Sequence, residues 1–180
     1  TRMVLASNGD ISFYEDTGST AKLFWDASAE SLGIGTTSPY GKLRLNETAG
    51  SCQFYITSSN TSDSSIIFGS QDDLATGSIS YFQSDDSLRF SGYNNQEALR
   101  IDTSGNLLVG TTDTALFNNT SGGGFCVSSN GNTQITKQGA DAADPVLLLN
   151  QTGIDGEILR FYKGGSTVGN IGTQGGDLNI

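Results

Sequence analysis

Apolar and polar residues alternate along several short stretches of the chain. In "SCQFYIT", residues 51–57, Cys52, Phe54 and Ile56 fall on one side and the residues between them fall on the other. The same period of two recurs in "KLRL" (42–45) and "ALRID" (98–102). Successive side chains of a strand point to opposite faces, so each stretch predicts a β-strand with one apolar face.

Clusters of turn-forming residues separate these stretches. Four of them lie at Ser84–Asp86, Ser104–Asn106, Gly164–Gly165 and Gly175–Gly176. Gly and Asn tolerate positive φ, and Asp and Ser bond nearby amides, so these clusters predict hairpin turns. The nearest approach to a helix, residues 140–143, is too short and is closed by a proline. The pattern therefore predicts an all-β chain of short strands.

One segment of the chain is written twice, about 75 residues apart. "LGIGTT" (32–37) matches "LLVGTT" (107–112), and "LFWDASAES" before the first copy lies over "LRIDTSGN" before the second. Downstream, Cys52 falls over Cys126. We expect each copy to be the end of a strand followed by a corner. Gly35 and Gly110 would then hold equivalent positions that need positive φ or close approach of the backbone.

A second signature occurs three times. It consists of a Gly, an Ile two residues on, an aromatic pair and a turn, and it stands at 9–20, 77–87 and 156–167. The two signatures predict the end of a first repeat unit over 1–45, a complete unit over 46–120 and most of a third over 121–180. We expect the array to continue beyond Ile180. Because Thr1 is no translation start, we expect the chain to be a fragment or a processed product.

Composition predicts a thin core. Gly, Ser, Thr and Asn make up about 44% of the 180 residues, and Leu, Ile, Val and Phe about 23%. That apolar content is enough to fold but too small for one unit to enclose a core by itself. Units stacked along an axis, with identical chains around it, would bury the apolar stripes. The fold predicted is therefore a repetitive, elongated β-fibre formed by a parallel homotrimer.

The charge of the chain narrows the choice of partners. A net charge of -10 opposes binding to nucleic acid and to anionic membrane surfaces. The chain has no run of about 18 apolar residues, so we expect no membrane insertion. Cys52 and Cys126 stand alone without metal-ligand spacing and are interpreted as small apolar residues, with a disulfide left open.

Candidate chemistry is limited to acidic pairs. The chain has no His, which excludes a Ser-His-Asp or Cys-His arrangement within it. Paired carboxylates can cleave glycosidic bonds when a groove holds them apart. The pairs are Asp72 with Asp73, Asp85 with Asp86, Asp141 with Asp144, and Asp155 with Glu157. Their Gly- and Ser-rich surroundings favour solvated turn acids, and no calcium-loop motif is present, so we predict no catalytic, cofactor or metal residue.

The aromatic pairs of the second signature invite two interpretations. They are Phe13/Tyr14, Tyr81/Phe82 and Phe161/Tyr162. Such rings can stack on sugars, or they can pack between chains. Because they recur at the same place in each unit, we favour packing, with the pairs in layers near a threefold axis.

The motifs "LGIGTTSPYGKLRL", "LRIDTSGNLLVGTT" and "ILRFYKGGSTVGNIGTQGGDLNI" resemble the distal tail-fibre and tailspike proteins of tailed bacteriophages, particularly marine ones. In that family such segments precede a C-terminal intramolecular chaperone of the endosialidase type. The second copy departs from the pattern, with Asp113-Thr114 in place of Ser-Pro, and no chaperone domain is present. The resemblance implies trimeric β-structure and carries no catalytic residues.

The function expected is that of a non-enzymatic structural component of the virion, in the extracellular tail fibre. It would present a receptor-binding tip for host attachment. Its partners would be its own copies, other tail proteins and a host-surface glycan or protein. A bacterial surface adhesin stalk and a tailspike glycan hydrolase with inter-subunit carboxylates stay open as alternatives.

Overall fold

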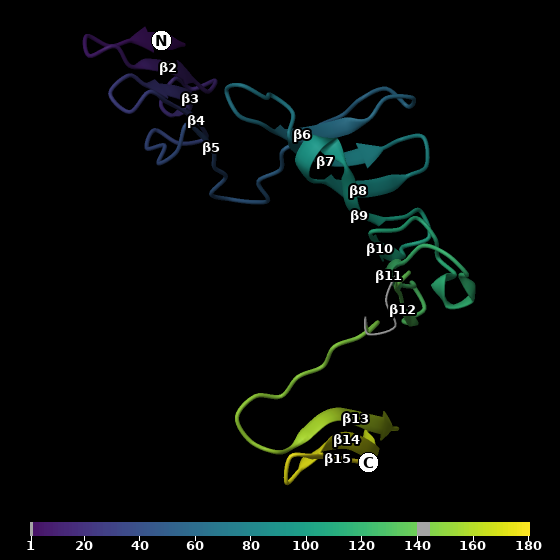
Figure 1. Ribbon diagram of the computed structural model, residues 1–180. Helices are drawn as coiled ribbons and strands as arrows, with labels where there is room; N and C mark the ends of the chain where they lie inside the picture. The colour runs from purple at the N-terminus through teal and green to yellow at the C-terminus, as the bar shows by residue number, and fades with distance from the viewer. Residues whose placement is uncertain (1, 140–144) are drawn as a thin grey trace. The chain divides into compact units, whose positions relative to one another are not determined.

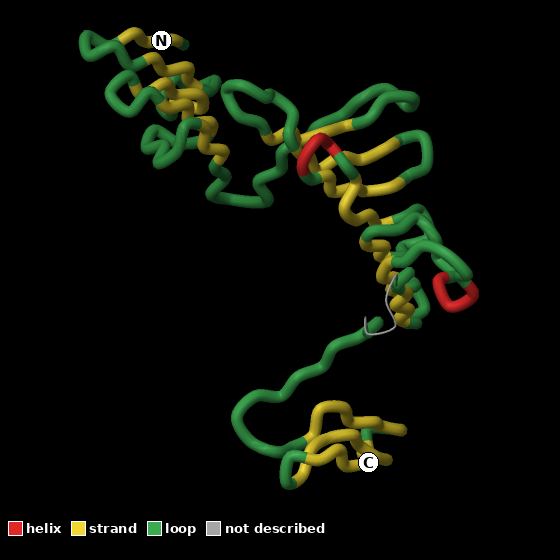
Figure 2. The backbone as a smooth tube through the Cα atoms, viewed as in Figure 1, coloured by secondary structure: helices red, strands yellow, loops and turns green. Residues whose placement is uncertain are grey.

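The computed structural model describes residues 2–139 and 145–180. These residues form fifteen β-strands in three sheets and two short 3-10 helices, and they contain no α-helix (Figures 1 and 2). The prediction of an all-β chain is confirmed. Contacts divide the chain into two units, Thr1–Ile56 and Thr57–Ile180.

The first sheet, sheet A, contains five strands in sequence order. They are β1 (Met3–Leu5), β2 (Ile11–Tyr14), β3 (Ala21–Asp26), β4 (Ser31–Ile34) and β5 (Leu43–Leu45). The first four strands pair antiparallel through short turns. β5 instead runs parallel to β4, because the eight residues 35–42 carry the chain back to the starting end of β4.

The second sheet, sheet B, is a seven-stranded antiparallel meander. Its strands are β6 (Ser64–Phe68), β7 (Gly77–Phe82), β8 (Ser87–Ser91), β9 (Glu97–Ile101), β10 (Leu107–Val109), β11 (Gly124–Val127) and β12 (Thr133–Thr136). The 3-10 helix η1 (Tyr93–Asn95) joins β8 to β9, and η2 (Leu116–Asn118) lies between β10 and β11. Leu116 of η2 packs with Leu108 and Cys126 to form a small buried cluster.

The third sheet, sheet C, contains β13 (Glu157–Lys163), β14 (Ser166–Gln174) and β15 (Asp177–Asn179). Two tight turns connect them. Gly164 and Gly165 form the first turn and Gly175 and Gly176 the second, all four with positive φ. These are two of the four predicted turns. Those at Ser84–Asp86 and Ser104–Asn106 are also confirmed, between β7 and β8 and between β9 and β10.

The same five-residue loop closes three hairpins. It spans 6–10, 102–106 and 128–132. In each copy the amide of the first residue donates to the carbonyl of the fifth, and the Gly amide donates back to the first carbonyl, at 2.8–3.0 Å. The glycines are Gly9, Gly105 and Gly131, with φ of +93°, +79° and +91°. A left-handed Gly ending a type I turn gives the twist that antiparallel strands need, so "SNGD", "TSGN" and "SNGN" each encode a hairpin.

Several predicted elements differ from the structure. Residues 51–57 form no strand, and every side chain in that segment is exposed, because no neighbouring strand pairs with it. Cys52 is therefore exposed, whereas Cys126 is buried in β11, and the two positions are not equivalent. The expected unit boundary after residue 45 coincides with the end of β5. The boundary expected between 120 and 121 lies inside sheet B, because β10 pairs with β11.

The two corner glycines have the expected backbone. Gly35 follows β4 with φ of +76°, and Gly110 follows β10 with φ of +66°. Their amides donate to the preceding strand in the same way, Gly35 to Lys22 at 2.7 Å and Gly110 to Ala98 at 2.9 Å. Their surroundings differ, since a Cβ on Gly35 would lie 1.9 Å from the carbonyl oxygen of Asn46, and one on Gly110 would meet nothing within 4 Å.

We expect Gly35→Ala to destabilise sheet A strongly. Left-handed backbone costs a non-glycine residue about 1–2 kcal/mol, and the collision with Asn46 adds to that. Trp25, the single Trp of the chain, lies in β3 and reports unfolding of this sheet by fluorescence. Gly41→Ala is the control, because its Cβ would meet nothing and its φ is ordinary. Equal urea midpoints for the two variants would contradict the assignment of Gly35 as a corner.

Candidate functional site

Asp85 belongs to a charged cluster on one face of sheet B, which also contains Arg89, Glu97 and Arg100. Asp85 accepts from the Ser87 hydroxyl at 2.7 Å and pairs with both arginines. Glu97 binds Arg100 at 2.5 Å and Arg89 at 3.3 Å. The Ser87 bond, followed by the two arginines, holds the pKa of Asp85 below its ordinary value despite some desolvation. With two acids and two bases the cluster is neutral, so it offers neither a free acid nor a free base.

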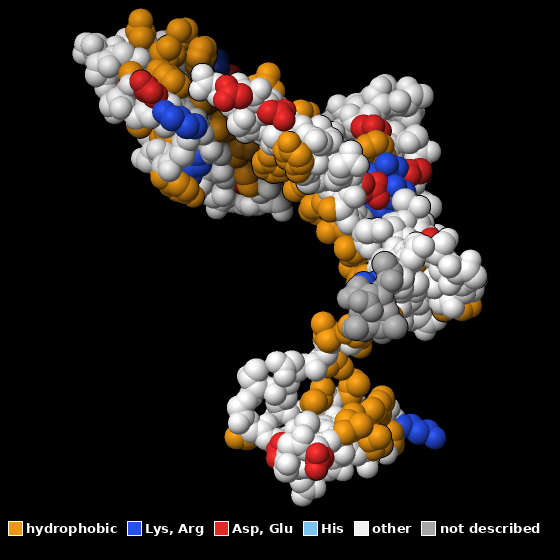
Figure 3. All heavy atoms as spheres, viewed as in Figure 1, with side chains coloured by type: hydrophobic (Ala, Val, Ile, Leu, Met, Phe, Trp, Pro, Cys, Tyr) orange, Lys and Arg blue, Asp and Glu red, His pale blue; other side chains and the backbone are white. Residues whose placement is uncertain are grey.

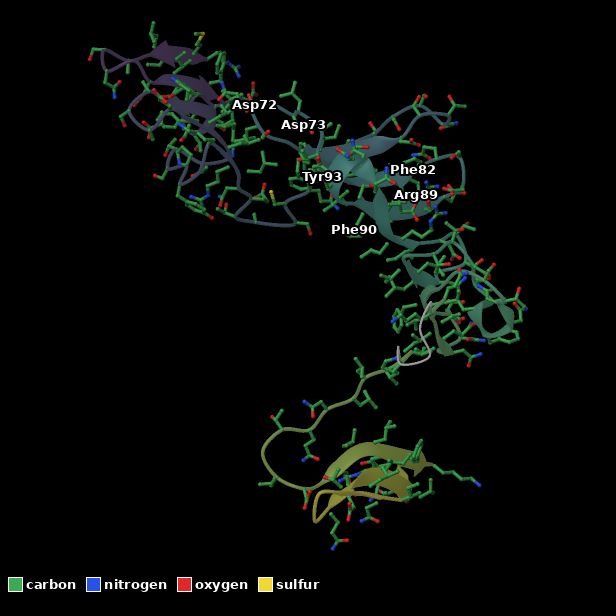
Figure 4. The ribbon with its side chains drawn as sticks, in the orientation of Figure 1. Asp72, Asp73, Phe82, Arg89, Phe90 and Tyr93 are labelled. Atoms are coloured by element: carbon green, nitrogen blue, oxygen red, sulfur yellow. The ribbon has the colours of Figure 1, made fainter. Side chains whose placement is uncertain are left out.

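Asp86, the other member of that predicted pair, lies apart from the cluster. Its carboxylate accepts from the Tyr81 hydroxyl at 3.1 Å, and this bond raises the pKa of Tyr81. Asp72 and Asp73 lie in the loop between β6 and β7, away from Arg89 (Figure 4). Asp73 accepts from the amide of Ala75 at 3.2 Å. Asp141 and Asp144 fall outside the described residues.

Asp155 and Glu157 lie beside a polar hollow in sheet C. The hollow has a volume of about 340 Å³, and Asn170, Gln174 and Asn179 also line it. The Asp155 carboxylate accepts from the amides of Gly175 and Gly176, which closes the turn between β14 and β15. Glu157 pairs with Arg160 and accepts from Asn170 at 2.6 Å. Both carboxylates already serve the fold, and neither is held across a groove from a second free acid.

Other acids, which sequence reasoning passed over, organise turns in the same manner. Glu15 accepts from the Thr17 hydroxyl at 2.6 Å and from the amides of Ser19 and Thr20 at 2.8 Å. The Thr17 hydroxyl and these amides lower the pKa of Glu15 from 4.5 to about 2. Asp102 bonds the amides of Ser104 and Asn106 in one of the repeated loops. The available signal was an acid at the start of a Ser-, Thr- and Gly-rich turn.

Metal and membrane features are absent from the described part of the chain. No group of three or more Asp, Glu or Cys side chains there is arranged to hold a metal ion. No helix in residues 2–139 or 145–180 is long and apolar enough to cross a membrane.

The strongest feature of the molecule is an apolar face on each sheet. In sheet A the register places residues of all five strands opposite one another, so that they share one face. That face consists of Met3, Leu5, Ile11, Phe13, Leu23, Trp25, Leu32, Ile34, Leu43 and Leu45. The positions between them, such as Ser12, Gly33 and Arg44, occupy the opposite face. No second layer from residues 2–56 covers the apolar face, and half of its side chains are exposed.

Sheet B repeats this arrangement on a larger scale. One apolar residue from every strand lines up across the sheet in a single row. The row is Ile66, Ile79, Phe90, Leu99, Val109, Phe125 and Ile135. A second row beside it runs through Tyr81, Leu88, Ile101, Leu107 and Val127. The opposite face carries the charged cluster and the small buried cluster under η2.

Sheet C has the same division. Leu159, Phe161, Ile171 and Leu178 share one face, and Arg160 and Asn170 share the other. We call these three surfaces the apolar faces. Figure 3 shows apolar side chains gathered in patches over the strands.

The predicted aromatic pairs are divided by this geometry. Successive residues of a strand point to opposite faces, so both members of a pair cannot face one axis. Tyr81 is on the apolar face of sheet B, whereas Phe82 is on the charged face, with the Arg89 guanidinium 3.9 Å from its ring centre (Figure 4). Phe161 is on the apolar face of sheet C, while Tyr162 accepts from Arg160 at 3.1 Å. The prediction that both rings of each pair lie in layers near one axis is therefore wrong for these two pairs, and only Tyr81 and Phe161 are on the apolar faces.

The chain has a very small buried core and many exposed apolar side chains. Among the described residues, Leu108, Leu116 and Cys126 are the buried apolar side chains, and 31 large apolar side chains are exposed. The accessible surface is 12822 Å² for 18.8 kDa. Even three separate compact bodies, each with a third of that mass, would together expose only about 11,200 Å². Of the 31 exposed side chains, 13 lie on the apolar faces, which we take as the candidate functional surface of the protein.

No protein-family model matches the chain, and no curated protein matches it.

The turn acids predict a specific acid response of sheet A. Because the pKa of Glu15 is about 2 in the folded chain and 4.5 for an ordinary glutamate, its carboxylate contributes stability above about pH 4.5. That contribution is lost as the pH falls through the window from 4.5 to 2. We expect Glu15→Gln to lower the urea midpoint of sheet A, followed by Trp25 fluorescence, at pH 6 but to match the parent near pH 2.

Asp16→Asn is the matched control for this experiment. Asp16 is the next residue, and its carboxylate forms an exposed ion pair with Arg2 at 2.8 Å. Exposed pairs contribute little, so the variant should follow the parent at both pH values. A Glu15→Gln deficit that is equal at pH 6 and pH 2 would show that the carboxylate charge plays no part.

Proposed function

We propose that the chain is a structural segment of a bacteriophage tail fibre, which assembles as a parallel homotrimer and presents a receptor-binding tip to the host surface. The observation that carries the proposal is the set of apolar faces, which the chain exposes and does not cover. Exposed apolar surface of this extent is typical of a subunit interface. The resemblance of the repeated motifs to tail-fibre proteins is the basis for proposing a trimer and a location in the virion.

One-sided sheets suit a closed assembly around an axis. Three copies in register would place each apolar face opposite its own equivalents and leave the polar faces in water. Full burial of a Leu, Ile or Phe contributes about 1.5–3 kcal/mol. In sheet B, Ile66, Val109 and Ile135 of this row are exposed and the other four residues are half-buried, so covering the row would offset part of the cost of association, about 4–15 kcal/mol.

The engagement of the carboxylates supports a non-enzymatic role. Asp85, Asp155 and Glu157 are bonded to turn amides, hydroxyls, an amide side chain or arginines in ways that a general acid or base would have to break. The partners proposed are further copies of the chain, other tail proteins and a glycan or protein of the host surface. The place of action proposed is the extracellular virion.

The assembly is tested by two neighbouring isoleucines of β6. Ile66 is on the apolar face and 46% exposed, whereas Ile67 is on the opposite face and 58% exposed. We expect the parent and Ile67→Asp to have three times the 18.8 kDa chain mass by light scattering. Ile66→Asp should dissociate the trimer or weaken it at least about a hundredfold, because a buried unpaired charge is very costly.

This comparison has clear contrary outcomes. A parent mass of one or two chains would contradict the trimer. A trimer that Ile66→Asp and Ile67→Asp affect equally would show that the apolar face of sheet B is not the contact. Circular dichroism of both variants checks that the sheet itself is kept.

The non-enzymatic role is tested with host-surface polysaccharide. We expect the assembled protein to leave the chain length of the polysaccharide unchanged over prolonged incubation, as followed by size-exclusion chromatography. Depolymerisation that disappears in Asp85→Asn or Asp155→Asn would identify the protein as a hydrolase and overturn this part of the proposal.

A further inference from the structure

Residues 52–57 have the pattern of a strand but no strand partner. Cys52, Phe54 and Ile56 alternate with Gln53, Tyr55 and Thr57, and the segment carries no charge, no Gly and no Pro. All six side chains are exposed, with Phe54 at 67% and Tyr55 at 74%. A segment of this kind, left uncovered, is a template for aggregation. We call residues 52–57 the unpaired segment.

The strand just before it in the chain, β5, has a free edge that lacks a strand partner. β5 is an edge of sheet A, and its first neighbour β4 uses the carbonyl of Lys42 and the amide of Asn46, each at 2.9 Å. Alternate residues of a parallel strand bond the same neighbour. The backbone groups of Leu43 and Leu45 therefore point away from β4, toward the free edge of the sheet.

The two elements match in face as well as in backbone. Leu43 and Leu45 belong to the apolar face of sheet A, while Arg44 lies on the opposite face with its guanidinium 4.2 Å from the ring centre of Tyr40. A strand added to β5 with Cys52, Phe54 and Ile56 beside the two leucines would extend the apolar face. Gln53, Tyr55 and Thr57 would then stand on the side of Arg44. This pairing would bring no charged side chain onto the apolar face, because the added strand carries no charge.

The same chain does not make this pairing. Six residues, 46–51, separate β5 from the unpaired segment, which is long enough for a hairpin. Glu47 instead accepts from the amides of Thr48 and Ala49 at 2.7 and 2.8 Å, and the chain leaves the edge of β5 open. One chain thus has both a free sheet edge, at β5, and an unpaired strand-like segment. If copies exchange this segment, the backbone groups of both elements form hydrogen bonds.

We propose that the unpaired segment of one copy adds as a sixth strand to β5 of a second copy of this chain. The inference rests on the proposed homotrimer and names one of its contacts. Main-chain hydrogen bonds to Leu43 and Leu45 would fix the strand, and Phe54 and Ile56 would join the apolar face of the neighbour. Around a threefold axis the exchange closes on itself and covers the free β5 edge of all three copies.

Disulfide trapping with the native Cys52 tests the contact. Cys126 is fully buried, so Cys52 is the reactive thiol of the parent. Leu43→Cys places a second thiol on the face that Cys52 should join, whereas Arg44→Cys places it one residue along the same strand on the opposite face. Under mild oxidation of the assembled protein, we expect chains linked to one another in Leu43→Cys, and at least about tenfold fewer in Arg44→Cys.

Two controls define the linked species. Leu43→Cys combined with Cys52→Ser should lose the cross-links, which excludes bonds between two introduced thiols. Non-reducing gels distinguish chains linked to one another from a loop closed within one chain. A colorimetric thiol reagent should modify Cys52 at least about tenfold more slowly in the assembled parent than in Ile66→Asp, in which we expect free chains.

Light scattering on the same samples separates this inference from the proposed function. A trimer with cross-links only within single chains, with equal cross-linking of Leu43→Cys and Arg44→Cys, or with a fully reactive Cys52 overturns the strand exchange and leaves the trimer standing. A parent that has the mass of one chain overturns the homotrimer and the exchange with it.

Discussion

Cross-strand register is the constraint on which this structure depends. Residues that stand opposite one another in neighbouring strands share a face, and a shift of one residue would move every side chain to the other face. The turns of this chain keep the register in phase across whole sheets, so that Leu5, Ile11, Trp25 and Leu32 fall in one line. Apolar side chains are thereby collected on single faces, and no second layer formed by residues 2–139 or 145–180 covers them within either unit.

The turns that hold this register are built from polar contacts. The buried Asn106 shows how neighbouring turns are joined, since it bonds Asp102 within its own loop and accepts from the amide of Ser129 in the next loop. Asp10 joins two neighbouring turns of sheet A in the same way, because its carboxylate accepts a hydrogen bond from the amide of Ala27. Hydrogen bonds from turn amides favour the charged form of these carboxylates, so a chain with a net charge of -10 uses acids such as Asp10 and Asp102 to fix its turns.

Local sequence patterns located turns and some of the strands, but not which segments pair with one another. Alternation located β5 and β9, and clusters of turn-forming residues located four turns, because both signals are local. The parallel pairing of β5 with β4 and the lack of a partner for residues 52–57 depend on where a free edge lies, which no local pattern encodes. The repeat was detectable as far as Gly35 and Gly110, yet the chain then takes two different routes.

The sequence predicted that apolar surface would be left uncovered, but it did not predict how much or which residues would share a face. Low apolar content pointed to a thin core, but only the register reveals that a row of seven apolar residues crosses all of sheet B. Sequence reasoning assigned both rings of each aromatic pair to one interface, although a period of two separates Tyr81 from Phe82. Arg89 covers Phe82 on the charged face and so removes it from the apolar surface.

A single layer of strands cannot be stable in water through its own packing. Three buried apolar side chains, all close to η2, are the whole enclosed core among the described residues, and they support one end of sheet B. Backbone hydrogen bonds alone contribute too little to order fifteen strands against the loss of conformational entropy. The remaining stabilisation has to come from covering the apolar faces. In the homotrimer that we propose, further copies of the chain would supply this cover, since their apolar faces have the same register.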